Sequence, residues 1–137
     1  MIVLDTNVLS EALRPQPAIA VVDWLNAQEA ATLYISSVTV AEMLFGVAVL
    51  PEGQRKDNLG LAIKGLLGLF EGRVLPFDTD AASHHAKLAV LARANGRGFP
   101  TPDGYIAATA AARGYAIASR GTAPYRAAGL EVIDPWC

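Results

Sequence analysis

Three carboxylates are distinguished by the sequence around them. Asp5 directly follows the apolar run Ile2-Val3-Leu4, Glu42 interrupts the apolar stretch from Val38 to Val49, and Asp103 lies near the start of an alanine-rich segment. Carboxylate oxygens are the ligands that hard divalent cations such as Mg²⁺ and Mn²⁺ prefer. A cation held among carboxylates lowers the pKa of a bound water and neutralises charge on a phosphate. Together, the three acids would suit metal-dependent phosphodiester hydrolysis.

Each acid also has an ordinary structural explanation. Asp5 can cap the helix that follows it, and Glu42 completes Thr39-Val40-Ala41-Glu42, which has the pattern of a capping box. Asp103 lies in a predicted first helical turn, where the helix dipole favours a negative charge. Taken singly, each acid leaves both readings open. A shared site requires that the fold bring the three together.

Short apolar strands and longer helices alternate along the chain and determine where the acids lie. Strands are predicted at 2–4, 33–35, 73–77, 115–119 and 130–133, and helices at 8–13, 18–28, from 36–37 to the break at 51–53, 54–70, 79–95 and 102–113. Loops are expected at 96–101 and at 121–128, the latter with about one helical turn. This alternation predicts an α/β sandwich with a largely parallel central sheet. Sites in such sheets lie outside the carboxyl ends of the strands, where Asp5 falls.

Length and composition predict one globular domain over residues 1–137. Of these residues 53% are hydrophobic and 18% are charged, which excludes a disordered chain. The longest stretch without a charged side chain runs from Ala30 to Ala41, short of the ~20 apolar residues of a membrane helix. The start, MIVLDTN, lacks the features of a signal peptide, and Cys137 is the only cysteine. We therefore expect a cytoplasmic protein without disulfides or membrane partners.

The net charge of −2 excludes a strongly basic nucleic-acid binder, but the charge is unevenly distributed. Between Ala81 and Leu130 the only acid is Asp103. The basic residues in this half are Lys87, Arg93, Arg97, Arg113, Arg120 and Arg126. They are either solvated surface charges or a surface that attracts a polyanion.

Other chemistries have weaker support in the sequence. No glycine-rich phosphate loop is present. His84 and His85 are neighbours on a predicted helix and point about 100° apart, which makes them a poor metal pair. Trp24 and Trp136 are interpreted as core or interface aromatics.

The segments that carry the three acids resemble those of a known family, the PIN-domain ribonucleases. The matching segments are Leu4 to Glu11 (LDTNVLSE), Ile35 to Met43 (ISSVTVAEM) followed by Gly46, and Pro102 to Ala110 (PDGYIAATA). Two more, Gly72 to Asp78 (GRVLPFD) and Ile133 to Trp136 (IDPW), are similar to the branch of VapC and FitB-like toxins. The resemblance covers essentially the whole chain, with its motifs in order.

The resemblance implies a PIN-like α/β/α sandwich and an Mg²⁺- or Mn²⁺-dependent endoribonuclease that uses water as its nucleophile. By the same resemblance, Asp5 and Asp103 bind metal, Glu42 completes the site through the metal or its bound water, and Thr6 and Asn7 support Asp5. Toxins of this branch pair with a small antitoxin and usually form homodimers. RNA with exposed loops is the expected substrate.

One departure from the family pattern concerns a fourth acid or amide near the C-terminus. This chain has Ser119-Arg120-Gly121-Thr122-Ala123-Pro124-Tyr125 there, and neither Gly121 nor Pro124 supplies a carboxylate. Asp78, Asp80 and Asp134 are alternatives, each with an ordinary turn explanation. The number of metals therefore stays open, and Arg120 remains a candidate for binding substrate phosphate.

The missing acid motivates a second hypothesis, a catalytically impaired PIN-like module that binds RNA or protein without cutting. A DNA or flap-type nuclease would share the metal chemistry, but the short chain has no room for a duplex-handling domain. Apolar residues on the early helices form either the core or a surface for a dimer partner or an antitoxin. These are Leu9, Leu13, Trp24, Leu44, Phe45 and Leu50.

Overall fold

The centre of the protein is a five-stranded sheet, seen in a computed structural model that describes residues 1–99 and 101–137. Its strands are β1 (Ile2–Leu4), β2 (Leu33–Ser36), β3 (Val74–Leu75), β4 (Ala116–Ala118) and β5 (Val132–Ile133). They lie in the order β3-β2-β1-β4-β5, and all four pairings are parallel. The prediction of a largely parallel sheet is confirmed.

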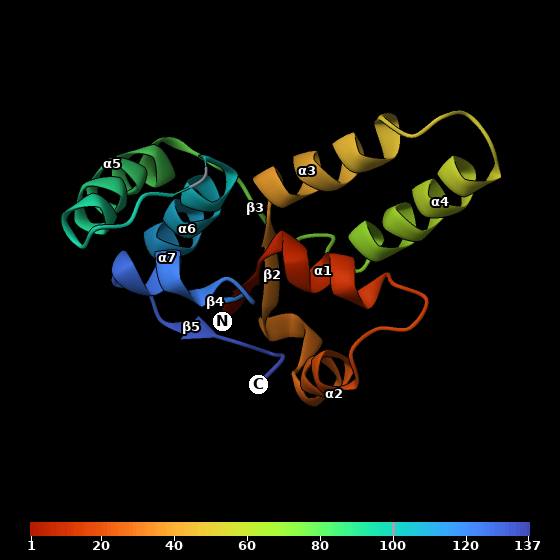
Figure 1. Ribbon diagram of the computed structural model, residues 1–137, viewed down its shortest axis with the longest axis horizontal. Helices are drawn as coiled ribbons and strands as arrows, with labels where there is room; N and C mark the ends of the chain where they lie inside the picture. The colour runs from red at the N-terminus through yellow and green to blue at the C-terminus, as the bar shows by residue number, and fades with distance from the viewer. Residues whose placement is uncertain (100) are drawn as a thin grey trace.

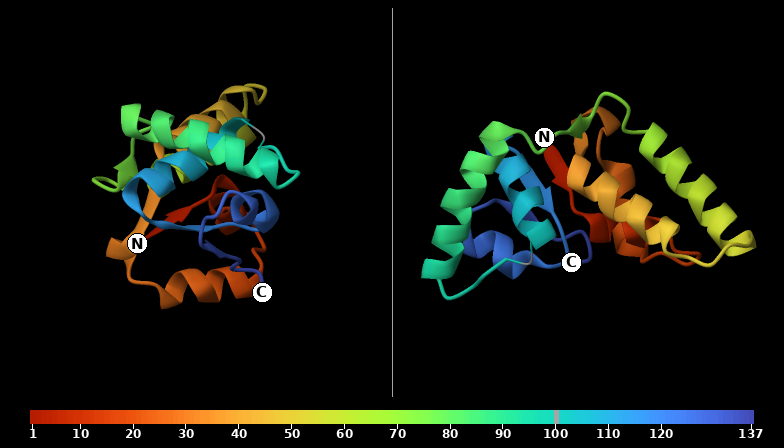
Figure 2. Two further views of the ribbon diagram at one scale, coloured as in Figure 1. Left: turned by 90° about the vertical axis from the view of Figure 1, so that its left-hand side faces the viewer. Right: turned by 90° about the horizontal axis from the view of Figure 1, so that it is seen from above.

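Helices cover both faces of this sheet. They are α1 (Thr6–Ala12), α2 (Ile19–Ala27), α3 (Ser37–Ala48), α4 (Gln54–Gly68), α5 (Thr79–Ala94), α6 (Thr101–Arg113) and α7 (Thr122–Ala127). Figure 1 shows α5, α6 and α7 on one side of the strands and α1 to α4 on the other. Seen from above in Figure 2, the α3–α4 pair extends away from the sheet. The layers are those of an α/β/α sandwich.

The core consists of two apolar clusters, one on each face of the sheet. Successive strand residues point to opposite faces, so Leu4 packs with Val8, Ile35 and Met43 in one cluster. Val3 belongs to the other, which is lined by helix α6 and α7 residues such as Ile106 and Tyr125. Alternation along β1, the central strand, therefore determines which helices pack on which side.

The direction of sheet growth reverses between β1 and β4. From β1 the chain adds β2 and β3 on one side, then crosses over to add β4 and β5 on the other. Leu4 pairs with Ala118, and the Asp5 amide donates to the Ala118 carbonyl oxygen over 2.9 Å. The next residues, Asp5 and Ser119, thus leave the sheet side by side at a topological switch point, where α/β sheets bind ligands.

The largest differences from the predicted elements are near the C-terminal half. β3 covers only Val74–Leu75, because Pro76 has no amide to continue the ladder. The predicted loop at 121–128 contains the six-residue helix α7 instead of a single turn. The predicted loop at 96–101 includes Pro100, which lies outside the described residues. Within residues 1–99 and 101–137, no helix has the length and apolar character needed to span a bilayer.

Candidate active site

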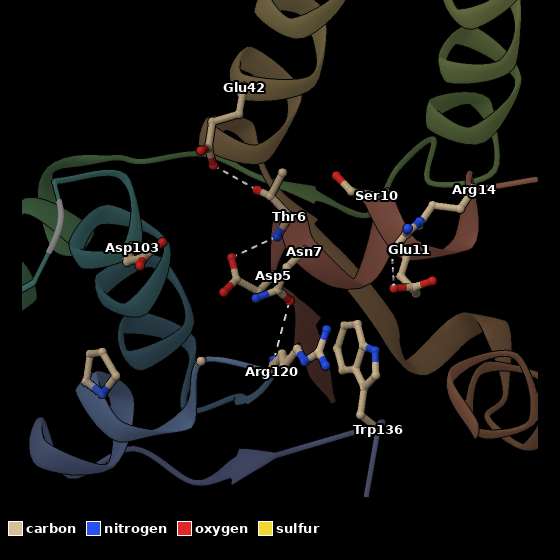
Figure 3. A pocket seen from close by; sticks show the side chains of 12 residues that line it. Asp5, Thr6, Asn7, Ser10, Glu11, Arg14, Glu42, Asp103, Arg120 and Trp136 are labelled. Carbon is tan, nitrogen blue, oxygen red and sulfur yellow. Dashed lines mark hydrogen bonds and ion pairs between the residues drawn. The ribbon is translucent and has the colours of Figure 1, made fainter. Parts of the chain in front are cut away.

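All three candidate acids line one cleft at the carboxyl edge of the sheet. The cleft has a volume of about 650 Å³, and Asp5, Glu42 and Asp103 border it together with Thr6 and Asn7. Figure 3 shows Glu42 on α3, Asp103 on α6 and Asp5 below them, directly before α1. The fold therefore brings together side chains separated by up to about a hundred residues, a convergence that the sequence pattern alone left open.

Asp5 is buried and held by three donors. Its Oδ1 accepts from the Thr6 amide over 2.8 Å, which makes it the N-cap of α1 as well as a cleft residue. Its Oδ2 accepts from the hydroxyls of Ser119 and Tyr125, each over 2.8 Å. Burial and the negative charge of Asp5 raise the pKa of Tyr125 well above its usual 10. Tyr125 therefore stays protonated and remains a donor to the carboxylate.

Glu42 is fixed by the residue next to Asp5. The Thr6 hydroxyl donates to Oε1 of Glu42 over 2.7 Å and lies 3.0 Å from the hydroxyl oxygen of Thr39. The predicted capping box at Glu42 is wrong, because Ser36 is the N-cap of α3 and accepts from the Thr39 amide over 3.1 Å. Glu42 lies a turn further on, so its carboxylate is left to face the cleft.

Asn7 connects α1 to the segment after β4. Its Nδ2 donates to the Ser119 hydroxyl oxygen over 3.2 Å, and its Oδ1 accepts from the Arg120 amide over 3.4 Å. The Ser119 oxygen also accepts from the Gly121 amide over 3.1 Å. Thr6 therefore stabilises the side of the cleft formed by α3, and Asn7 stabilises the side formed by the segment after β4.

Asp103 lies in the first turn of α6, where the sequence placed it. Partial burial, followed by the negative charges of Asp5 and then Glu42, raises its pKa to about 6. Gly104 beside it lets α5 approach, since an added Cβ there would lie 3.1 Å from Nε2 of His85 and 3.3 Å from Cβ of Phe99. Because the negative charges of Asp5 and Glu42 raise the pKa of Asp103, the three carboxylates repel one another across the cleft.

The donor set fits a hydrated divalent cation. The oxygens are hard ligands, and the charges of Asp5 and Glu42 add to partial burial in raising the pKa of Asp103. In the described part of the chain, no three acid, imidazole or thiol groups are gathered as a ready-made metal cluster. Mg²⁺ is often held by only one or two carboxylates and keeps several waters. An ion bound partly through water is therefore compatible with this wider arrangement.

The position of the missing fourth acid is also in the cleft. Gly121 and Pro124 both border it. Asp78 instead caps α5 by accepting from the Ala81 amide over 2.9 Å, and Asp134 accepts from the Trp136 amide over 2.9 Å in a turn. Neither these two acids nor Asp80 is among the described residues that line the cleft. The cleft thus keeps three of the expected four acidic positions.

Three more charged residues complete the wall of the cleft. Arg14 lies 3.5 Å from buried Glu11, which also accepts from the Ala18 amide at the start of α2. Arg120 is the only member of the basic half, as far as the structure describes it, that borders the cleft. Arg113 is instead directed to Asp78, 3.9 Å away. The basic half therefore contributes a single side chain to the site.

Ser119 and Tyr125 are site residues that the sequence analysis missed. Ser119 had a usable signal, because it directly follows a strand that is predicted to lie in the same sheet as the strand before Asp5. Tyr125 had none, since its segment was predicted as a loop. Only the packing of α7 brings its hydroxyl to Asp5.

Comparisons with known proteins identify the family of the chain. Residues 2–130 match the PIN domain family. The chain belongs to the PIN-domain family. It is 48% identical to the VapC ribonuclease Y4jK of Sinorhizobium fredii over 137 residues, which cover 99% of this chain and 98% of the relative.

Two further comparisons place the chain in the VapC and FitB branch of the PIN-domain family. Toxin FitB of Neisseria gonorrhoeae is 44% identical over 99% of both chains. The crystal structure of FitAcB from the same organism superposes with a TM-score of 0.94, at 44% identity and 99% coverage of each chain. The sequence-based assignment to this branch of PIN domains is therefore confirmed.

Proposed function

We propose that this PIN domain is a divalent-metal-dependent endoribonuclease and the toxin of a toxin–antitoxin pair. The observation that carries the proposal is the convergence of Asp5, Glu42 and Asp103 on one cleft, where partial burial and then the charges of Asp5 and Glu42 raise the pKa of Asp103. This excess of negative charge favours a cation. The similarity to a VapC ribonuclease supports RNA as the substrate.

The residues of the cleft have distinct proposed roles. Asp5, Glu42 and Asp103 hold Mg²⁺ or Mn²⁺, which when bound supplies a water of lowered pKa and positive charge at the phosphate. Ser119 and Tyr125 fix the orientation of Asp5, and Thr6 fixes Glu42. Arg120 contacts a substrate phosphate with a charge-assisted hydrogen bond.

Cleavage of a mixed RNA pool with Mg²⁺ or Mn²⁺ tests the proposal. We expect the wild-type protein to cut, and D5N or added EDTA to abolish cleavage while circular dichroism shows an intact fold. Matched DNA oligonucleotides distinguish a ribonuclease from a DNA nuclease. Cleavage by purified D5N at the wild-type rate, or cleavage that persists in EDTA, would contradict the proposal.

An apolar groove beside the cleft is the proposed seat of the antitoxin. It has a volume of about 360 Å³, is lined by Leu13, Met43, Leu59 and Ile63, and shares Thr6 and Glu42 with the acid cleft. An amphipathic segment laid into such a groove would cover the entrance to the acids. The groove is formed by α1, α3 and α4 and the turn after α1, and Leu13 is the one early-helix candidate among the described residues that lines it.

The remaining apolar surface supports a homodimer. Leu9 is buried and Leu13, Trp24 and Leu50 are partly buried, whereas Leu44 is 53% and Phe45 67% exposed. Exposed apolar side chains on the extended α3–α4 pair favour a protein interface. Size-exclusion chromatography with light scattering tests this: a monomer at high micromolar concentration would contradict the dimer.

A binding module without catalysis is the second candidate, and Gly121 and Pro124 in the cleft wall favour it. It predicts RNA or protein binding by wild type without metal-dependent cleavage. Specific cleavage that a chelator abolishes would reject it.

A further inference from the structure

Arg120, the residue proposed to contact a substrate phosphate, is paired in the acid cleft with Trp136, to which the proposed hydrolysis gives no role. The guanidinium carbon of Arg120 lies 5.2 Å from the centre of the Trp136 ring, and both residues border the cleft. Figure 3 shows the guanidinium and the indole next to each other, on the side of the cleft away from Glu42. The pair joins the segment after β4 to the segment after β5.

Both members of the pair are held at their backbones. The Trp136 amide donates to Oδ1 of Asp134 over 2.9 Å, and Pro135 before it is buried. The Arg120 amide donates to Oδ1 of Asn7 over 3.4 Å. The indole is only partly buried, because it packs against the core on one part of its surface and borders the cleft with another.

The charge of Arg120 is left unpaired within the described residues. Four acids border the same cleft, yet no carboxylate of residues 1–99 or 101–137 lies within 4.0 Å of the Arg120 guanidinium. Arg14, in contrast, lies within salt-bridge distance of Glu11. Arg120 is exposed and stacked on an aromatic ring instead, which leaves its N–H groups available to an external anion.

We propose that Arg120 and Trp136 form a stacking subsite for an unpaired nucleobase of the RNA strand next to the phosphate that is cut. This inference rests on the proposed function and names the form of its substrate. Guanidinium and indole planes both stack on bases without selecting a sequence, and the guanidinium also binds phosphate. Bases in a duplex are already stacked on their neighbours, so the subsite selects RNA that is single-stranded beside the cut.

The fluorescence of Trp136 provides a direct test of stacking. The chain has two tryptophans, so a W24F variant leaves Trp136 as the only one. In the W24F/D5N protein, which binds without cutting, we expect an unpaired RNA oligonucleotide to quench Trp136 emission. The same strand annealed into a duplex is expected to quench at least fivefold less at equal concentration. Anisotropy of an end-labelled oligonucleotide measures binding independently of tryptophan.

Variants separate stacking from folding. We expect W136A to weaken binding of the unpaired oligonucleotide about tenfold, and W136F to bind within about threefold of the parent because a phenyl ring still stacks. R120K keeps the positive charge but loses the planar guanidinium group, so it should weaken binding. W24F is a matched aromatic change away from the cleft and should not weaken binding. In otherwise wild-type protein W136A should raise KM and leave kcat within about threefold, since the three acids are untouched.

Three results would overturn the inference, and they differ in what they imply for the proposed ribonuclease function. RNA binding by anisotropy with unchanged Trp136 emission, and with W136A equal to the parent, would reject the stacking subsite and leave the ribonuclease proposal standing. Loss of antitoxin affinity in W136A with RNA binding intact would assign the pair to the protein partner. Neither binding nor cleavage of RNA by wild type would reject the proposed function and the subsite together.

Discussion

The phenolic hydroxyl of Tyr125 donates to Oδ2 of Asp5 over 2.8 Å, although the two residues are 120 positions apart in the chain. Ser119 donates to the same oxygen over 2.8 Å. Two donors on Oδ2 fix the carboxylate plane and leave Oδ1, which accepts only from the Thr6 amide among the described donors, as the freer oxygen. The orientation of the central acid is therefore set before any ligand binds.

Removing the Tyr125 hydroxyl is expected to impair metal binding more than folding. Y125F keeps the buried ring but deletes one donor to Asp5. Loss of such an outer partner typically costs ~10-fold or more in metal affinity or activity, against about 1 kcal/mol of stability for the hydrogen bond. Mn²⁺ titration calorimetry and cleavage rates provide the measurement.

The control for Y125F is a buried hydroxyl outside the cleft. Thr109 is 1% exposed and its hydroxyl donates to the Tyr105 carbonyl oxygen over 2.8 Å, so T109V deletes a comparable bond. We expect T109V to lose some stability and to keep wild-type metal affinity. Equal metal affinities in Y125F and wild type would show that Tyr125 does not orient Asp5.

Asp103 is expected to destabilise the metal-free protein at neutral pH. Its pKa of about 6 lies above its ordinary value of 3.8, so between these values the folded state binds more protons than the unfolded state. Stability then falls as pH rises through this window. Because the group is only partly buried, D103N should add about 1 kcal/mol at pH 7.5 and almost nothing at pH 4.5.

Thermal melts of metal-free D103N and wild type at pH 4.5 and pH 7.5 check this dependence. Added Mg²⁺ should stabilise wild type more than D103N, while D103N abolishes cleavage. The contrary result is that the two proteins differ in melting temperature by the same amount at both pH values. That result would show that folding does not raise the pKa of Asp103.

Thr6 is expected to act on activity through Glu42. T6V keeps the side-chain volume but removes the hydroxyl that donates to Oε1 of Glu42 over 2.7 Å. We expect kcat to fall about tenfold or more because the carboxylate loses its fixed orientation. T6S retains the hydroxyl and should stay close to wild type. If T6V and T6S cleave RNA equally fast, Glu42 does not depend on this bond.

Restoring an acid at position 121 should strengthen metal binding. Gly121 is the N-cap of α7 with φ −81°, and an added Cβ would meet only Oγ of Ser119 at 3.9 Å, an ordinary contact. Aspartate is also a good N-cap. We expect G121D to raise Mn²⁺ affinity about tenfold, since each added carboxylate increases the charge around the ion.

G121N is the matched control, because it caps α7 without adding charge. Calorimetric titration of both variants with Mn²⁺ gives the affinity and the number of ions bound. Identical affinities for G121D and G121N would mean that position 121 does not face the ion. A second bound ion in G121D alone would show that the natural chain holds one for lack of this acid.

A bulky residue at Gly46 is expected to block the antitoxin. Gly46 lines the apolar groove, and no atom of the described residues lies within 4 Å of a Cβ built there. G46Q should weaken antitoxin binding by about 2 kcal/mol or more, a typical cost at a critical interface position, and preserve RNA cleavage. Gly65 on α4 is equally open but does not line the groove, so G65Q controls for helix propensity. Biolayer interferometry with the cognate antitoxin compares them; unchanged affinity in G46Q would place the antitoxin elsewhere.

The sequence predicted the three acids because each is anomalous in its surroundings. Asp5 ends an apolar strand, Glu42 interrupts an apolar helix, and Asp103 is an isolated acid in a basic half. Family resemblance then supplied a common site. The strand and helix alternation also predicted the parallel sheet and most helix bounds to within a few residues.

The contacts that orient the acids could not be predicted in the same way. The hydroxyl of Tyr125 reaches Asp5, and Trp136 reaches the cleft, only through the tertiary packing of a short helix and a turn. Such contacts produce no hydrophobic periodicity in the sequence. The capping-box alternative at Glu42 fails because Ser36 is the N-cap of α3, so the helix begins one turn before Thr39, where its start at 36–37 was predicted. Local patterns therefore predict which residues are candidates for the site, whereas long-range contacts determine how those side chains are oriented in it.

The placement of β1 in the middle of the sheet has a consequence for synthesis on the ribosome. Strand β1 emerges before its partner β4, and the donors Ser119 and Tyr125 lie 114 and 120 residues after Asp5. A nascent chain that carries Asp5, Glu42 and Asp103 still lacks the hydrogen bonds that orient Asp5. The hydrogen bonds that orient Asp5 can therefore form only after Ser119 and Tyr125 have left the ribosome.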